Sequence, residues 1–299
     1  MQKDMQNDIT EQITYSTVLI RCYDDQDKEY GSGTGFIMGL FMEGNNGHPF
    51  IITNKHVIED SVRTEIELCK ADGNGKPIDT DTTLLQIEKS EWFFHREESV
   101  DLCCCSLMNV LHENKVDMSS VFFCPLSTSL IPTEEALSSF LAIEEVYMVG
   151  YPKGIFDDYN HKPITRKGIT ASHPKKDYQE SKETLLDIAV FPGSSGSPVL
   201  LLNSGSCILT LSNLTATTRP FLLGVVYAGW EEDEKEQTRV VNIPVKRDFE
   251  HKAYKYFNLA VMIKAEKILD FEKMLKPEIP ETETESIPHE SAENPKTKE

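Results

Sequence analysis

The apolar residues of this chain fall into many short runs that are rich in β-branched side chains and end at Gly, Pro or Asn. Short runs with turn residues between them are typical of antiparallel strands, so they predict an all-β fold built from barrels or sandwiches. With 299 residues and 39% hydrophobic side chains, the chain can bury one or two cores. We interpret it as two antiparallel six-stranded β-barrels followed by a C-terminal helix and a disordered acidic tail.

Changes in composition give the expected boundaries. A segment containing Pro125 and Pro132 separates the two barrels, and functional groups would meet in the cleft between them. The end of the chain is rich in Pro, Glu, Thr and Ser and cannot bury enough apolar surface to order itself. The predicted segments are a polar N-terminal arm (1–12), a first barrel (13–118), a linker (119–140), a second barrel (141–263), a helix (264–275) and the tail (276–299).

The segment FPGSSGSPVL, residues 191–200, surrounds Ser195 with Gly193, Gly196 and Pro198. Both glycines can adopt positive φ angles, and they let the backbone pass close to other groups. A tight turn of this kind can direct the amides of Gly193 and Ser195 at one point beside the Ser195 hydroxyl, as an oxyanion hole requires. Because the same residues are common in plain loops, the segment predicts a nucleophile only if a base and a carboxylate accompany it.

A serine hydroxyl needs a base, normally a histidine that a carboxylate holds in the right tautomer. Of the eight histidines, only His56 follows an apolar run, HPFIITNKH, that is typical of a buried strand and a short turn. Among the acids, Asp101 stands directly before an apolar stretch in SVDLCCCSL, whereas most others lie in charged runs. His56, Asp101 and Ser195 are therefore the candidate catalytic residues.

These three segments resemble those of chymotrypsin- and trypsin-like serine proteases, especially the HtrA-type and other bacterial trypsin-like branches. IITNKHVI resembles the family's histidine segment, SVDLCCCSL its Asp-Leu-Ala-Leu-Leu segment and GSSGSP its Gly-x-Ser-Gly-Gly-Pro, in the family's order His, Asp, Ser. YGSGTGFIMG, VYMVGYPKG and LLGVVYAGW also match family strands, but no segment resembling a PDZ domain is recognised. The resemblance covers roughly residues 15–275.

The resemblance implies an acyl-enzyme mechanism in which Ser195 attacks, His56 transfers the proton, Asp101 orients His56, and the Gly193 and Ser195 amides bind the oxyanion. It also implies that the strand LLGVVYAGW pairs with an extended substrate. The family's specificity pocket maps onto Ala189 at its base and onto Val190, Val226, Tyr227, Ala228 and Gly229 beside it. This apolar pocket would prefer Val, Leu, Ala or Met before the cleaved bond, unless a nearby carboxylate such as Asp187 reaches it.

Two positions depart from the family. Ser194 stands where digestive relatives have an Asp that receives the new N-terminus after zymogen cleavage, so activation by that ion pair is not expected. Ser197 replaces the second Gly of the motif, as in some bacterial relatives. We favour an active serine endopeptidase. A pseudoprotease that uses the cleft as a peptide-binding scaffold is the alternative, and an esterase, whose Gly-x-Ser-x-Gly elbow is lacking, is a second one.

The net charge of −19 argues against binding to a nucleic-acid backbone. The chain has neither a signal-like N-terminus nor about 18 consecutive apolar residues, and its seven cysteines show no paired framework. We therefore expect a cytoplasmic protein with free thiols, no membrane contact, no cofactor and no metal. The expected binding partner is a protein or peptide substrate. We also consider the hypothesis that a regulatory protein partner, or assembly into a larger complex, restrains the enzyme.

Overall fold

The computed structural model describes residues 8–43, 46–203, 206–210, 213–216, 219–232, 238–245 and 255–275. The predicted acidic tail, 276–299, and most of the predicted N-terminal arm lie outside these ranges. At the end of that arm the chain forms helix α2, Ile9–Ser16, whose first turn is capped by the Asp8 carboxylate accepting a hydrogen bond from the Thr10 amide.

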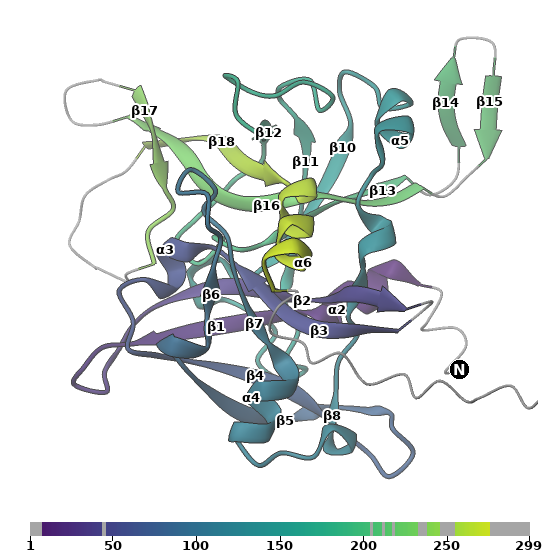
Figure 1. Ribbon diagram of the computed structural model, residues 1–299. Helices are drawn as coiled ribbons and strands as arrows, with labels where there is room; N and C mark the ends of the chain where they lie inside the picture. The colour runs from purple at the N-terminus through teal and green to yellow at the C-terminus, as the bar shows by residue number, and fades with distance from the viewer. Residues whose placement is uncertain are drawn as a thin grey trace, which may run out of the picture.

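The N-terminal half forms a nine-stranded sheet, shown in purple and blue in Figure 1. Its main path runs β5-β4-β1-β2-β3-β7-β6, with β8 beside β4 and β9 beside β2. Within the described residues, no pairing joins the two ends of this path. The strands are β1 (Thr17–Tyr23), β2 (Glu29–Glu43), β3 (Asn46–Thr53), β4 (Arg63–Ala71), β5 (Pro77–Glu88), β6 (Phe93–Phe94), β7 (Cys103–Ser106), β8 (Val121–Phe122) and β9 (Leu126–Ser127).

The C-terminal half forms a closed barrel of six antiparallel strands in the order β13-β10-β11-β12-β18-β16, which a pairing between β13 and β16 closes. A seventh strand, β17, pairs with β16 outside this closure, and β14 and β15 form a separate hairpin. The strands are β10 (Glu145–Gly150), β11 (Ile164–Thr170), β12 (Glu183–Asp187), β13 (Pro198–Asn203), β14 (Ser206–Thr210), β15 (Asn213–Ala216), β16 (Arg219–Glu232), β17 (Thr238–Asn242) and β18 (Lys255–Lys264).

The predicted all-β class with a C-terminal helix is confirmed. One half is the expected closed six-stranded barrel, whereas the other is a larger sheet with two short added strands. At the C-terminal end, a 3-10 turn (Ala265–Leu269) leads into helix α6 (Asp270–Leu275), which lies between the two halves in Figure 1. The remaining helices are short connections: α3 (Lys55–Ile58), α4 (Leu107–Glu113) and α5 (Glu134–Ser138).

Three apolar clusters form the interior, and strand alternation assigns residues to them. Along β7, Cys103 and Cys105 belong to the core of the first sheet, while Cys104 belongs to a central cluster shared by both halves. The same central cluster contains Ile268, Phe271 and Leu275. The cysteines therefore act as small buried hydrophobic residues, and one face of the C-terminal helix packs against the core.

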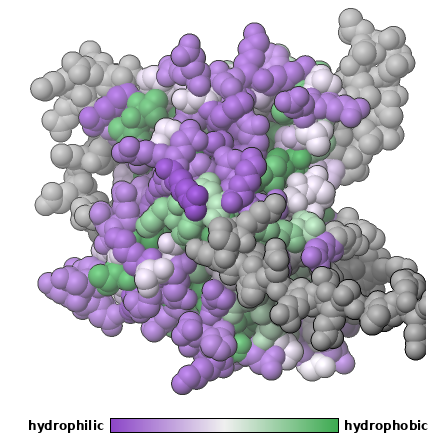
Figure 2. All heavy atoms as spheres, in the orientation of Figure 1, coloured by the Kyte–Doolittle hydropathy of each residue, from purple (hydrophilic) through white to green (hydrophobic). Residues whose placement is uncertain are grey.

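Within the described residues, no disulfide involves Cys22, Cys69, Cys103, Cys104, Cys105 or Cys124, and the Cys207 side chain lies outside the description. No helix in the described ranges has the length and apolar character needed to cross a bilayer. Figure 2 shows polar and charged side chains over most of the face viewed in Figure 1, with small hydrophobic patches between them.

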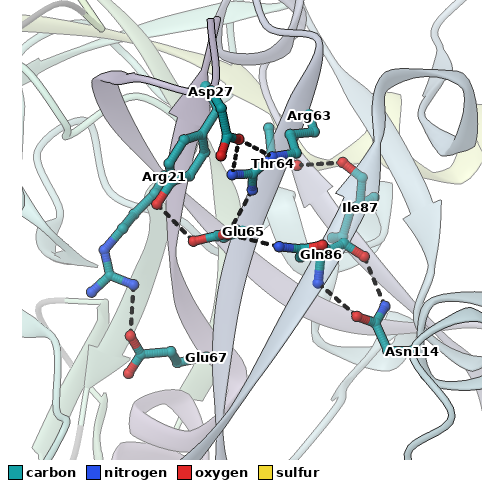
Figure 3. Close-up of polar contacts among 10 residues, drawn as sticks. Arg21, Asp27, Arg63, Thr64, Glu65, Glu67, Gln86, Ile87 and Asn114 are labelled. Atoms are coloured by element: carbon teal, nitrogen blue, oxygen red, sulfur yellow. Dashed lines mark hydrogen bonds and ion pairs between the residues drawn. The ribbon is translucent and has the colours of Figure 1, made fainter.

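A polar network crosses the face of β1, β4 and β5 (Figure 3). Its centre is Glu65, which is only 7% exposed. Tyr23 Oη and Arg63 Nη1 each donate to its carboxylate over 2.6 Å, and Gln86 Nε2 donates over 3.2 Å. Burial raises the pKa of Glu65, but these donors outweigh burial, and the pKa lies below its ordinary value.

We predict that Glu65→Gln lowers the free energy of unfolding at pH 7 by about 1–3 kcal/mol, because the variant loses the charge that these donors stabilise. The pKa of Glu65 is depressed in the folded state, so its contribution is present above the unfolded-state pKa and is lost as the pH falls through the folded-state pKa. Urea denaturation of wild type and Glu65→Gln between pH 7 and pH 3 measures the difference in their free energies of unfolding. A stability difference that does not shrink toward acid would contradict the assignment.

Candidate active site

The pairing of β3 with β7 brings His56 and Asp101 together. Thr53, the last residue of β3, pairs with Cys103, the first residue of β7. The chain that leaves β3 toward His56 and the chain that enters β7 from Asp101 therefore meet at the same end of this strand pair. His56 lies on α3, whose N-cap is Asn54. The Asn54 side-chain amide donates to the Asp101 carbonyl over 2.8 Å, which fixes the two segments to each other.

The His56 and Asp101 side chains make a close and well-defined contact. His56 Nδ1 lies 2.5 Å from Asp101 Oδ2, and the His56 backbone amide donates to Asp101 Oδ1 over 3.1 Å. The two side chains are 8% and 15% exposed. With both carboxylate oxygens engaged, Asp101 holds the imidazole ring with Nδ1 as the donor and leaves Nε2 free to accept a proton.

Ser195 reaches this pair from the other half of the molecule. It lies in the loop before β13, and its Oγ is 2.8 Å from His56 Nε2. The three residues predicted from the sequence are therefore brought into one chain of contacts, Ser195–His56–Asp101. No group of three or more His, Cys, Asp or Glu side chains suited to a metal ion occurs within the described residues.

The nucleophile loop, residues 191–197, adopts the geometry that its glycines predict. Gly193 and Gly196 have φ angles of +91° and +85°. A Cβ atom at Gly196 would lie 1.8 Å from the Thr34 carbonyl oxygen, so only glycine fits there. Neither the Gly193 nor the Ser195 amide donates to an acceptor in the described part of the chain, which leaves both able to bind a ligand oxygen.

Thr34, in the middle of β2, connects the first sheet to the nucleophile loop. Its amide donates to the Ser195 carbonyl over 2.8 Å, and its hydroxyl donates to the Gly193 carbonyl over 2.8 Å. The same hydroxyl accepts from the Tyr151 amide over 3.0 Å. Sequence reasoning missed this role, although Thr34 lies within the glycine-rich stretch YGSGTGF that the resemblance had marked.

The residues predicted for the specificity pocket separate into two groups. In the first group, Val190 and Val226 are buried in the core cluster of the second barrel. Gly229 lies next to Val190, because a Cβ atom at Gly229 would be 3.1 Å from Val190 Cγ2. Ala189 is partly buried and Ala228 is fully buried, while Asp187 is exposed on β12. The Tyr227 side chain packs against the central cluster instead, and its hydroxyl donates to Glu183 over 2.7 Å.

One neighbour of the triad was not foreseen. The carbonyl oxygen of Ile243, just after β17, lies 3.2 Å from both Ser195 Oγ and His56 Nε2. The expected bounds of the second barrel, 141–263, include Ile243 but give it no role in the site. The segment TRVVNIPV, residues 238–245, is rich in β-branched residues and was the available signal of a further strand.

We predict that Thr34→Val slows modification of Ser195 by a fluorophosphonate probe by about tenfold, because the Gly193 carbonyl of the loop loses its hydroxyl donor and the Tyr151 amide loses its acceptor. Thr34→Ser keeps the hydroxyl and should react at nearly the wild-type rate. The measurement is the second-order rate of adduct formation followed by intact mass. Equal rates for Thr34→Val and wild type would show that Thr34 does not position the loop.

The chain matches a known protein family. A family model described as a trypsin-like peptidase domain matches residues 33–208, a range that contains His56, Asp101 and Ser195. No curated protein sequence matches the chain.

Two solved structures are similar to this chain. One is a scabies mite inactivated protease paralogue, S-I1, with 14% identity and a TM-score of 0.45 over 89% of this chain and 96% of that one. The other is the active form of the Rv3671c protease from M. tuberculosis, with 16% identity and a TM-score of 0.42 over 80% of each chain. Because the family model spans more than half of the sequence, the chain belongs to the trypsin-like peptidase family.

Proposed function

We propose that this protein is a serine endopeptidase that cleaves protein substrates through an acyl-enzyme. The observation that carries the proposal is the continuous contact from Ser195 Oγ to His56 Nε2, at 2.8 Å, and from His56 Nδ1 to Asp101 Oδ2, at 2.5 Å. A serine hydroxyl becomes an effective nucleophile when a base oriented in this way can take its proton.

In the proposed reaction, Ser195 Oγ attacks the carbonyl carbon of the scissile bond while its proton moves to His56 Nε2. Asp101 stays ionised and stabilises the imidazolium that forms. The amides of Gly193 and Ser195 donate to the oxyanion of the tetrahedral intermediate. The intermediate then collapses, His56 gives its proton to the leaving amine, and water releases the acyl group by the same steps in reverse order.

Two other activities were expected as alternatives from the sequence. A silent peptide-binding scaffold has no need for the close Ser195–His56 and His56–Asp101 contacts. An esterase of the α/β-hydrolase type holds its serine on a turn between a strand and a helix, whereas Ser195 precedes strand β13. Both observations support the peptidase. The six cysteines whose side chains the structure describes form no disulfide, which supports the expected cytoplasmic location because thiols stay reduced in such compartments.

We predict that Ser195→Ala lowers the rate of peptide hydrolysis by about a million-fold, the loss found when the nucleophile of subtilisin is removed. Ser197→Ala is a matched control, because Ser197 lies two residues away and its buried hydroxyl has no hydrogen-bond partner among the residues that the structure describes. The control should stay within a few-fold of wild type. Hydrolysis of a chromogenic peptide amide measures all three proteins, and an unaltered rate in Ser195→Ala would refute the proposal.

We predict a preference for aliphatic residues such as Ile, Val, Leu, Ala or Met before the cleaved bond. Val190, Val226 and the backbone of Gly229 offer apolar surface, and a buried Arg or Lys without a partner charge would cost several kcal/mol. Discrimination between aliphatic side chains should be modest, about 1–3 kcal/mol per methylene. Mass-spectrometric profiling of a random peptide library tests this, and dominant cleavage after Arg or Lys would mean that a carboxylate reaches the pocket.

A further inference from the structure

Strand β17 is not needed to close the second barrel. The barrel closes through the pairing of β13 with the first part of β16, from Arg219 to Val225. The second part of β16 pairs with β18 on one side and with β17 on the other, where Ala228 faces Asn242 and Glu231 faces Arg239. In Figure 1, β17 runs from the barrel toward α3, the helix that carries His56. It occupies an edge that would otherwise be free to pair with another extended chain.

The chain beyond β17 continues straight into the triad. The Ile243 amide donates to the Tyr227 carbonyl over 3.0 Å, which extends the β17–β16 pairing by one step. The Ile243 side chain is fully buried in the cluster that contains Val190 and Val226. Its carbonyl oxygen lies 3.2 Å from Ser195 Oγ. One residue therefore fills the predicted specificity pocket and contacts the nucleophile.

The same segment then reaches the first sheet. The Val245 carbonyl accepts from the Ser32 amide of β2 over 3.1 Å. The approach is so close that a Cβ at Gly31 would lie 2.3 Å from the Val245 oxygen. We call residues 238–245 the cleft strap, because they cross from the second barrel to the first sheet over Ser195. The Ser195 residue is left only 1% exposed.

We propose that the cleft strap is an intramolecular pseudo-substrate that keeps the enzyme latent until an extended aliphatic peptide displaces it. The inference rests on the proposed endopeptidase function, because it assigns that site an occupant and a form of regulation. A substrate must pair with the same edge of β16 and bring its own carbonyl to Ser195, and the two chains cannot occupy these positions together.

The contacts of the strap are those of an inhibitor and not of a bond about to be cut. The Ser195 hydroxyl donates to the Ile243 carbonyl oxygen, whereas attack requires Oγ to approach the carbonyl carbon. That hydroxyl has one proton, so the Ile243 oxygen competes with His56 Nε2 for it. The strap therefore blocks access and also weakens the activation of the nucleophile.

Two contacts of different strength hold the strap in place, the buried Ile243 side chain and an ion pair of Arg239. Ile243 contributes burial of a whole aliphatic side chain. Arg239 pairs with Glu231 of β16 over 2.9 Å; Glu231 is only 5% exposed, but the Arg239 side chain is 62% exposed, so water and salt partly screen this contact. Release should depend mainly on Ile243, and a substrate that offers a comparable aliphatic residue can replace it.

The test compares full-length wild type, Ile243→Arg and the matched control Val240→Arg. An arginine cannot enter the apolar pocket, whereas Val240, three residues earlier, is 38% exposed and tolerates the same change. Fluorophosphonate labelling of Ser195 and hydrolysis of a peptide amide with Ile before the cleaved bond are measured for each. We expect both rates to rise about tenfold or more in Ile243→Arg, the factor that corresponds to losing one buried aliphatic anchor, and to stay at the wild-type value in Val240→Arg.

A second variant keeps the test valid if Ile243→Arg fails to fold. Arg239→Glu places a like charge beside the buried Glu231 carboxylate, so it should loosen β17 from β16 and raise both rates by a few-fold. Equal, readily measured rates in all four proteins would overturn the latency and leave the endopeptidase intact. Absence of labelling and hydrolysis in all of them, with each folded by circular dichroism, would overturn the proposed function and the strap with it.

Discussion

The hydrogen bonds of Thr34 hold the candidate site together, because its catalytic groups come from two separate sheets. Thr34 belongs to β2, yet it donates to two carbonyls of the nucleophile loop, and its own carbonyl accepts from the Thr53 hydroxyl over 2.7 Å. Thr53 is the last residue before the turn that carries His56. One fully buried residue thus sets the position of Ser195 relative to His56.

The sequence was sufficient to predict the parts of the site that local patterns specify. Gly193 and Gly196 indicated a turn with positive φ, and both have it. Strand periodicity places Cys103 and Cys105 on one face and Cys104 on the other, and the core clusters agree with it. These predictions succeeded because turn chemistry and strand periodicity depend on neighbours in the chain.

Features that depend on distant pairing could not be predicted in the same way. Nothing local to Thr34 indicates that its partners lie about 160 residues away in the nucleophile loop, where its hydroxyl contact spans a separation of 159 residues. The sequence TRVVNIPV is typical of a strand, but only the three-dimensional arrangement brings Ile243 to Ser195. Tyr227 was expected to line the pocket, but its hydroxyl donates to Glu183, and it is the Tyr227 backbone carbonyl that accepts from the Ile243 amide.

The cleft strap also explains how one fold can carry a complete triad and a protected edge at once. Strand β16 needs partners along its whole length, because unpaired edge groups invite pairing with other chains. The strap supplies those partners and at the same time fills the apolar pocket. In this proposal the cleft strap itself restrains the enzyme. A regulatory partner of the kind hypothesised from the sequence would then act by competing with the strap or by removing it from the cleft.

The central claim is that His56 activates Ser195. Peptide mapping after reaction with a fluorophosphonate, on wild type and on His56→Gln, tests it most directly, because the method identifies the modified residue. The account predicts a single adduct on the peptide that contains Ser195 and its loss in His56→Gln. An adduct on another residue, or one that forms on Ser195 at the same rate without the histidine, would contradict it.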